Sequence, residues 1–205
     1  MIQPNPPRWL IAGHASSQPG DIVDELKLGS AEVIVESNSS FADVDLNSFD
    51  AFILVISAKT GISSAMIELW ARICERQIPR MILVNGLELS EIDFDDIVLI
   101  VNRVLENVVT PFLVLHDELG EPSGLISLID GMVHDYSGAT ATIYTADDEL
   151  LNLVKDFREE LTLALSEMDD SAYSQGLVVP ALPLLSSGKF EVNEIQTFLR
   201  LLTTH

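Results

Sequence analysis

Three apolar runs, separated by two stretches of helical spacing, constrain the fold more than any other feature of this sequence. The runs are "AFILVIS" (Ala51–Ser57), "RMILVN" (Arg80–Asn85) and "TPFLVLH" (Thr110–His116), each typical of a strand covered on both faces. Helical spacing fills Ser63–Arg76 and Ile92–Val109. Strands that alternate with helices predict a parallel sheet with crossover helices, in the doubly wound arrangement.

The two ends of the chain extend this pattern. We expect short strands at Trp9–Ala12, Glu32–Glu36 and Leu177–Leu182, and helices at Gly20–Leu28 and Val192–Leu202. The polar stretch "SNSSFADVDLNS", which begins at Ser37, is predicted to be a loop or a degraded helix.

The middle of the chain follows a different pattern. The stretch "SGLISLIDGMVHDYSGATATIYT" predicts two or three short strands joined by glycine-containing turns, and Asp147–Met168 predicts one long amphipathic helix. The segment "DDSAYSQG" after it is expected to be a linker. We therefore predict an α/β fold with a mostly parallel sheet, formed by residues 1–116 plus 176–205, and an inserted α+β subdomain at residues 117–175.

Composition narrows the cellular setting. The 205 residues are 47% hydrophobic, enough for one domain, or one domain with an appendage, around a sizeable core. No apolar run is long enough to cross a membrane, and the first residues lack the pattern of a signal peptide. The single cysteine, Cys74, cannot form an internal disulfide and is expected to be a buried helix residue. These features predict a cytoplasmic protein with no membrane contact.

The charge restricts the partners. Eleven Lys and Arg residues against 32 Asp and Glu give a net charge of −21, and the cations do not cluster. Such a chain repels phosphate backbones, so we expect no direct nucleic-acid binding. A positively charged or hydrophobic protein partner is compatible with this charge, although the acidity could also serve solubility alone.

The stretch Phe49–Glu88 resembles the middle of the GTP-binding domain of elongation factor G and its relatives, among them the ribosomal protection proteins. In that family a strand ends in Asp-Ala or Asp-Ser, and a helix with a tryptophan, a Val-Pro-Arg turn and a strand ending in Asn-Lys-x-Asp follow. The corresponding pieces here are Ser57-Ala58, Gly61, Trp70, Ile78-Pro79-Arg80 and Asn85-Gly86-Leu87-Glu88.

Later segments extend this resemblance over most of the chain from about Trp9. Matching pieces of the family's G′ insertion and of its returning strand are Gly124–Ile129, Arg158–Leu161, Glu167–Asp170 and Val178–Leu182. The resemblance implies a fold of the P-loop GTPase type with a G′-like subdomain. In elongation factor G the G′ insertion contacts a stalk protein of the ribosome, which makes Asp147–Asp170 a candidate interaction surface here.

The residues that a GTPase needs are largely missing at the corresponding positions. A phosphate loop uses glycines to aim backbone amides at the phosphates, a lysine to neutralise their charge, and a hydroxyl to hold magnesium. The resemblance aligns Gly13 and His14 with the start of that loop. It then places Gln18 at the second glycine, Pro19 at the lysine and Gly20 at the hydroxyl.

Other GTPase motifs are also degraded. The interval Gly29–Asp50 is too short for the switch segments, and no Asp-Thr-Pro-Gly sequence occurs. Asn85 and Glu88 hold two positions of the guanine-recognition motif, and the final Ser-Ala motif is blurred into Leu185-Ser186. We expect no GTP hydrolysis, because phosphoryl transfer takes its rate from the magnesium and phosphate contacts that these residues would make.

The remaining polar clusters have ordinary structural interpretations. The four histidines are far apart in sequence, and a triad built from His116, Asp117 and a serine is disfavoured against strand-end or surface positions. Acidic groups at Asp93–Asp96 and Asp147–Glu149 are expected to cap helices rather than to bind calcium. The apolar stretch "LVVPALPLL" is read as a core strand and turn, with a partner groove as the alternative.

Together these features predict a pseudo-GTPase, a protein-interaction module that works without nucleotide, metal or other cofactor and has a protein partner associated with the ribosome. Gly13, His14, Gln18, Pro19, Gly20, Asn85 and Glu88 are then vestigial nucleotide-binding positions. The alternative is a translational GTPase-like protein that binds GTP or GDP with magnesium and acts on the ribosome. An enzyme with new chemistry in the cleft around Gly13–Gly20 is a third class that no residue supports.

Overall fold

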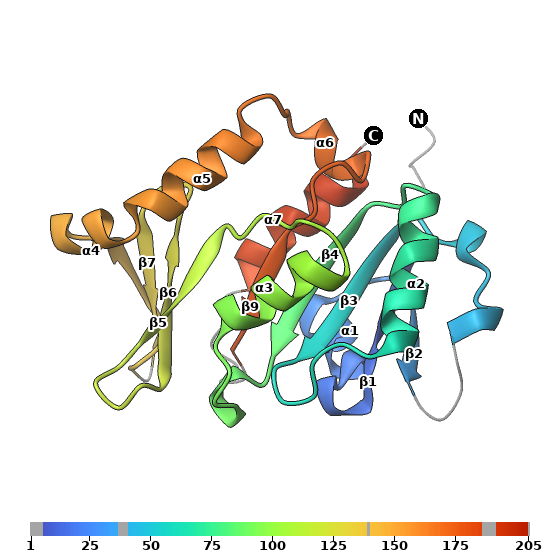
Figure 1. Ribbon diagram of the computed structural model, residues 1–205, viewed down its shortest axis with the longest axis horizontal. Helices are drawn as coiled ribbons and strands as arrows, with labels where there is room; N and C mark the ends of the chain where they lie inside the picture. Colours follow the sequence, from blue (N-terminus) through green and yellow to red (C-terminus); the bar gives the residue numbers. More distant parts are fainter. Residues whose placement is uncertain (1–5, 37–40, 139, 186–191, 205) are drawn as a thin grey trace.

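The computed structural model describes residues 6–36, 41–138, 140–185 and 192–204. Two sheets organise these residues (Figure 1). The first is parallel, with strand order β2-β1-β3-β4-β9, and the second is antiparallel, with order β5-β6-β7-β8. Both sheets were expected from the sequence.

The parallel sheet is built from β1 (Trp9–His14), β2 (Ala31–Glu36), β3 (Ala51–Ser57), β4 (Arg80–Asn85) and β9 (Ala181–Leu184). Its helices are α1 (Pro19–Leu26), α2 (Ser64–Glu75), α3 (Phe94–Val104) and α7 (Val192–Thr203). The chain runs from β1 to β2 in one direction and from β3 to β4 in the other. Right-handed crossovers then place α1 and α2 on opposite faces of the sheet.

Local sequence explains why these elements start where they do. Every residue of β3 is buried, as its unbroken apolar run predicts. Ser63 caps α2, since its side chain accepts a hydrogen bond from the backbone N–H of Met66. Pro19 is the first residue of α1, where its missing N–H costs nothing.

The antiparallel sheet consists of β5 (Phe112–His116), β6 (Pro122–Ser127), β7 (Met132–Asp135) and β8 (Thr142–Thr145). Helices α4 (Asp148–Leu153) and α5 (Lys155–Leu165) lie beside this sheet in Figure 1. A small apolar cluster joins strands and helix, formed by Leu113, Ile126, Leu128, Val133, Ala146, Val154 and Leu161. The larger core lies around the parallel sheet.

One predicted strand forms but belongs to a different sheet from the one expected. The run Thr110–His116 does form a strand, β5, but this strand pairs antiparallel with β6. Val109, just before it, forms a parallel bridge to Pro180, and Phe112 packs into the core around the parallel sheet, but β5 is not a strand of that sheet. An apolar run indicates burial but not which sheet buries it. The division of the chain at residue 116 stays a prediction, although the second sheet already begins at Phe112.

Helix lengths also differ from the predictions. The expected helix Asp147–Met168 is two helices with a break at Val154, which enters the small cluster while Leu153 stays 75% exposed. The expected helix Ile92–Val109 ends at Val104. Beyond that end, Asn102 Oδ1 accepts a hydrogen bond from the Val108 N–H and so fixes the turn.

Other segments differ in detail. The predicted strand Leu177–Leu182 is found later in the chain, as β9. The Val179 carbonyl before it accepts a hydrogen bond from the Val109 N–H instead. The expected linker holds a short helix, α6 (Ser171–Ser174), with Ala172 and Tyr173 buried. Residues 37–40 of the predicted loop lie outside the described residues, and the rest forms two short 3-10 helices, Phe41–Asp43 and Leu46–Ser48.

Candidate functional site

The parallel strands end together at a cleft. A cavity of about 390 Å³ lies beyond the carboxyl ends of β1, β3, β4 and β9. In a doubly wound sheet this edge is where ligands bind. The cavity is lined by Ser16, Gln18, Asp21, Ile22, Glu25, Leu26, Ser57, Lys59, Asn85, Gly86, Leu89, Leu184, Leu185 and Ile195.

The loop after β1 closes on itself. Residues Ala15–Ser17 form a 3-10 turn, and the Ser16 N–H donates to His14 Nδ1 at 3.1 Å. Ser17 is fully buried, and its hydroxyl donates to the His14 carbonyl at 2.8 Å. The Gln18 N–H donates to the Ala15 carbonyl at 3.2 Å. A phosphate loop aims such amides at its ligand, whereas these amides are bound within the loop.

Tight packing holds this turn in place. A Cβ atom on Gly13 would lie 2.5 Å from Ser17 Oγ and 2.6 Å from the Val55 carbonyl oxygen. Gly13 is therefore required by the contact between the loop and β3. Gln18 adopts a left-handed backbone conformation, with φ of 45°, and passes the chain directly into α1.

The start of α1 differs chemically from a phosphate site. Pro19 has no N–H to donate, and the following residue with charge is Asp21, in the first turn. The N-terminal end of a helix favours negative charge. Asp21 places a carboxylate there, and Glu25 adds a second carboxylate one turn later on the cavity wall.

The segment after β4 reaches the same cleft only in part. Asn85 Nδ2 donates to the Ser17 carbonyl at 2.7 Å, so this predicted residue meets the phosphate-loop position directly. Gly86 has φ of 71°, a left-handed conformation that favours glycine. Glu88 lies in the 3-10 turn that follows and lines a neighbouring small hollow with His116 and Glu121 instead. Ser186 lies outside the described residues.

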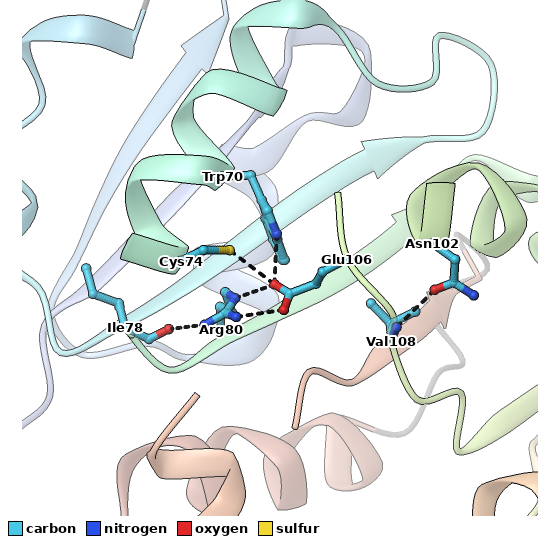
Figure 2. Close-up of polar contacts among 7 residues, drawn as sticks. All are labelled: Trp70, Cys74, Ile78, Arg80, Asn102, Glu106 and Val108. Carbon is cyan, nitrogen blue, oxygen red and sulfur yellow. Dashed lines mark hydrogen bonds and ion pairs between the residues drawn. The ribbon is translucent and has the colours of Figure 1, made fainter. Parts of the chain in front are cut away.

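A partly buried ion pair forms a second polar centre, away from the cleft (Figure 2). The Arg80 guanidinium donates two hydrogen bonds to the Glu106 carboxylate, at 2.6 and 2.8 Å. Trp70 Nε1 and Cys74 Sγ donate to the same carboxylate at 2.9 and 3.3 Å. This cluster joins α2 and β4 to the segment that leads into the antiparallel sheet, so its role is to fix that connection.

Burial and charge shift two pKa values in this cluster. Burial raises the pKa of the Cys74 thiol to about 11, and the Glu106 carboxylate adds to the rise. Burial would also raise the pKa of Glu106, but the hydrogen bonds and charge of Arg80 outweigh it and hold that pKa below its ordinary value. Cys74 is therefore a protonated hydrogen-bond donor at neutral pH.

Helices α4 and α5 carry the candidate interaction surface predicted at Asp147–Asp170. Asp147 caps α4, as expected, by accepting from the Leu150 N–H at 2.8 Å. Among the large apolar side chains here, Leu153, Phe157, Leu163 and Met168 are exposed. By contrast, Asp93 makes no side-chain cap on α3, and its carboxylate lies 3.5 Å from His116 Nε2.

Sequence reasoning missed two sets of residues. Asp21, Glu25 and Lys59 line the cavity; Lys59 follows the end of β3 closely, whereas Asp21 and Glu25 share one face of α1. Glu106 was also missed, because nothing in its local sequence marks a partner 26 residues away. Within the described ranges, no group of three or more His, Cys, Asp or Glu side chains could hold a metal ion. None of the described helices has the length and apolar character to span a membrane.

Comparison with known proteins bears on this geometry. No family model matches the chain. It is 24% identical over 131 residues to "Ribosome-releasing factor 2, mitochondrial" from Anopheles gambiae, which covers 62% of this chain but only 18% of that protein. A crystal structure of a protein from Thermus thermophilus matches with a TM-score of 0.68 and 18% identity, over 97% of this chain and 40% of that one.

The resemblance to elongation factor G is confirmed. The sequence match to a ribosome-releasing factor supports this resemblance, and the structural match shows that the fold is shared. The chain spans less than a fifth of the relative's length and less than half of the structural neighbour's. The activity of those whole proteins therefore does not transfer to this chain by similarity alone.

Proposed function

We propose that this chain is a pseudo-GTPase domain, a protein-interaction module that acts in translation without binding nucleotide. The observation that carries the proposal is the self-closed loop after β1. Its amides bond to His14 and Ala15, and Pro19 stands where a phosphate-binding lysine is needed. Phosphate binding would require these hydrogen bonds to break, and the loop has no cation that could hold the phosphate instead. The loop therefore opposes nucleotide binding.

The charge of the cleft supports the same conclusion. Asp21 and Glu25 line the cavity. Among the described residues of the lining, Lys59 is the single cation. A triphosphate would have to enter against two carboxylates with one ammonium to offset them. Gly20 stands at the position whose hydroxyl holds magnesium in a working site.

A role in translation is supported by the similarity to a ribosome-releasing factor. We place the interaction surface on α4 and α5. Leu153 and Leu163 are 75% and 76% exposed there, on a part of the chain that is otherwise rich in carboxylates. Leu153 lies on α4 and Leu163 on α5, and exposed apolar side chains that gather in one region are typical of a protein-binding surface.

The alternative is a GTP- or GDP-binding domain that acts on the ribosome with magnesium. Two observations favour it. The cavity lies at the strand ends where such domains bind nucleotide, and Asn85 keeps its place beside the loop.

Calorimetric titration with GTP and GDP, with and without magnesium, separates the two functions. The proposed function predicts no heat of binding up to about 1 mM nucleotide, which sets a weak limit on the binding free energy. Magnesium-dependent binding in the micromolar range, lost on Asn85→Ala, would instead establish the alternative.

Cosedimentation with ribosomes tests the role in translation. We expect the chain to sediment with ribosomes equally with and without GTP. A Leu153→Glu/Leu163→Glu double variant should lose this binding, whereas Leu119→Glu, on the exposed loop between β5 and β6, should keep it. If the wild-type chain fails to cosediment, the translation role is wrong.

A further inference from the structure

We infer that the cavity at the strand ends is a binding site for an amphipathic cation, an ammonium or guanidinium group on an apolar stem. This inference rests on the proposed function, because it requires that the cavity not be a nucleotide site. It assigns to the same cleft a ligand of the opposite charge.

The size and floor of the cavity suit the apolar stem. A volume of about 390 Å³ is in the range of small-molecule sites. Much of the lining is apolar and belongs to buried core residues: Ile22, Leu26, Leu184, Leu185 and Ile195. A methylene chain or an aromatic ring placed there would be removed from water, which favours binding in proportion to the apolar surface buried.

The polar lining suits the cationic head. Asp21 and Glu25 are four residues apart on α1, so they lie on one face of that helix and both line the cavity. Ser57 and Ser16 add hydroxyl groups that can accept hydrogen bonds. Asp21, Glu25 and Lys59 together give the cavity lining a net charge of −1.

Competing anion binding is opposed by the same residues. The Ser16 and Gln18 amides of the loop after β1 are bonded within the loop, and Asp21 already supplies the negative charge that the start of α1 favours. The ligand class is therefore cationic rather than phosphate-bearing.

Such a group could come from a free amine or from a lysine or arginine side chain of a protein partner. The recognition chemistry is the same in both cases. The overall charge of −21 would draw either one toward the domain.

Chemical-shift titration of the ¹⁵N-labelled full chain with three matched probes tests the inference. Phenethylamine, phenethyl alcohol and phenylacetate share an aromatic stem and differ in the charge of the head. We expect the amine to bind at least about 5-fold more tightly than the alcohol, with shifts at the cavity residues, and phenylacetate to bind weakest, since one ion pair near a protein surface is worth on the order of 1 kcal/mol.

Variants that change the charge of the cavity lining should change the affinity for the amine in opposite directions. Glu25→Gln should lower the affinity for the amine by roughly 3- to 10-fold, and Lys59→Met should raise this affinity by a similar factor. Both side chains are exposed, so neither change should unfold the protein. Glu159→Gln, on α5 and away from the cavity, is the matched control and should leave the affinity unchanged.

Two results would overturn the inference. If the alcohol binds as tightly as the amine, the cavity is an apolar pocket without charge preference. If phenylacetate binds most tightly, it is an anion site. Displacement of bound phenethylamine by magnesium-GTP would instead contradict the proposed function. Failure of the inference and failure of the proposed function therefore give different results.

The source of the cation is resolved by a second pair of probes. Spermidine represents free amines, and a capped Leu-Lys-Leu peptide represents a partner side chain. Tighter binding of the peptide assigns the site to a protein partner, and tighter binding of spermidine assigns it to free amines. If neither shifts the cavity residues, the inference fails for both sources.

Discussion

Arg80 shows how a single residue fixes the connection between the two sheets. Its side chain is 5% exposed, and Glu106, its partner in the ion pair, is 28% exposed. The guanidinium also donates to the Ile78 carbonyl, so most of its hydrogen-bonding capacity is used. A buried charge of this kind depends on its partner, because removing the partner leaves the charge without compensation.

We therefore predict that Glu106→Gln lowers the free energy of unfolding by about 2–3 kcal/mol at pH 7, less than for a fully buried pair because Glu106 is partly exposed. Urea denaturation measures this change. Glu159→Gln, which removes the exposed ion pair with Lys155, is the control and should change stability by less than about 0.5 kcal/mol. Equal effects of the two substitutions would contradict this role for Arg80.

The pH dependence of the Glu106 contribution follows from its pKa. The folded protein holds that pKa below the ordinary value of 4.5. The stabilisation is therefore present above about pH 4.5 and is lost as the pH falls through the lower, folded-state value. We expect the stability difference between wild type and Glu106→Gln to shrink below about pH 4.5 in denaturation curves, and to stay constant between pH 6 and 8.

Cys74 gives a prediction about reactivity. Its pKa is raised from 9.0 to about 11, so the thiolate fraction near pH 8 is about 100-fold lower than for an ordinary thiol. We expect iodoacetamide to alkylate the folded protein at least about 100-fold more slowly than the urea-unfolded chain. In Glu106→Gln the folded-state rate should rise, because the unpaired Arg80 charge then favours the thiolate. Fast alkylation of the folded wild type would show that the thiol is free of this cluster.

At the scale of elements, the loop between β1 and α1 is the decisive segment. It is held by close contact with β3 rather than by a ligand. A Cβ on Gly13 would meet the Val55 carbonyl, which belongs to the strand backbone and cannot rotate away.

We predict that Gly13→Ala destabilises the fold by about 2–3 kcal/mol, the cost of overpacking a buried contact. Gly20 provides the control, since a Cβ there meets nothing within 4 Å and the residue lies in α1. Gly20→Ala should be neutral or stabilise by up to about 0.5 kcal/mol. Thermal unfolding monitored by circular dichroism measures both, and equal shifts in Tm would argue against the tight packing of the loop.

Element prediction from sequence succeeded where local pattern and tertiary burial agree. The run Ala51–Ser57 becomes β3 with its expected bounds, and the middle block, for which two or three short strands were expected, holds β6, β7 and β8. Helix ends were less predictable. The break at Val154 depends on the cluster under the antiparallel sheet, which no local window contains.

For the whole molecule, the net charge of −21 is the dominant electrostatic feature. With 11 cations among 205 residues, most carboxylates have no cation close by in sequence. Like charges on a compact domain repel one another, and this repulsion is screened by salt.

We predict that raising NaCl from about 0.02 to about 0.5 M increases Tm by roughly 3–8 °C, since screening shortens the range of the repulsion from about 20 to about 4 Å. Scanning calorimetry measures the shift. An equal osmolality of glycerol serves as the control for solvent effects without ions. A fall in Tm with NaCl would show that attractive ion pairs outweigh the repulsion.

The sequence by itself determined the alternation of strands and helices, the acidity, the likeness to elongation factor G and the lack of a lysine at Pro19. Each of these depends on the identity and spacing of neighbouring residues. Only the tertiary structure decided that Thr110–His116 leaves the parallel sheet, that Glu106 meets Arg80, and that Asp21 and Glu25 face a cavity. These outcomes join residues far apart in the chain, and the path of the folded backbone brings them together.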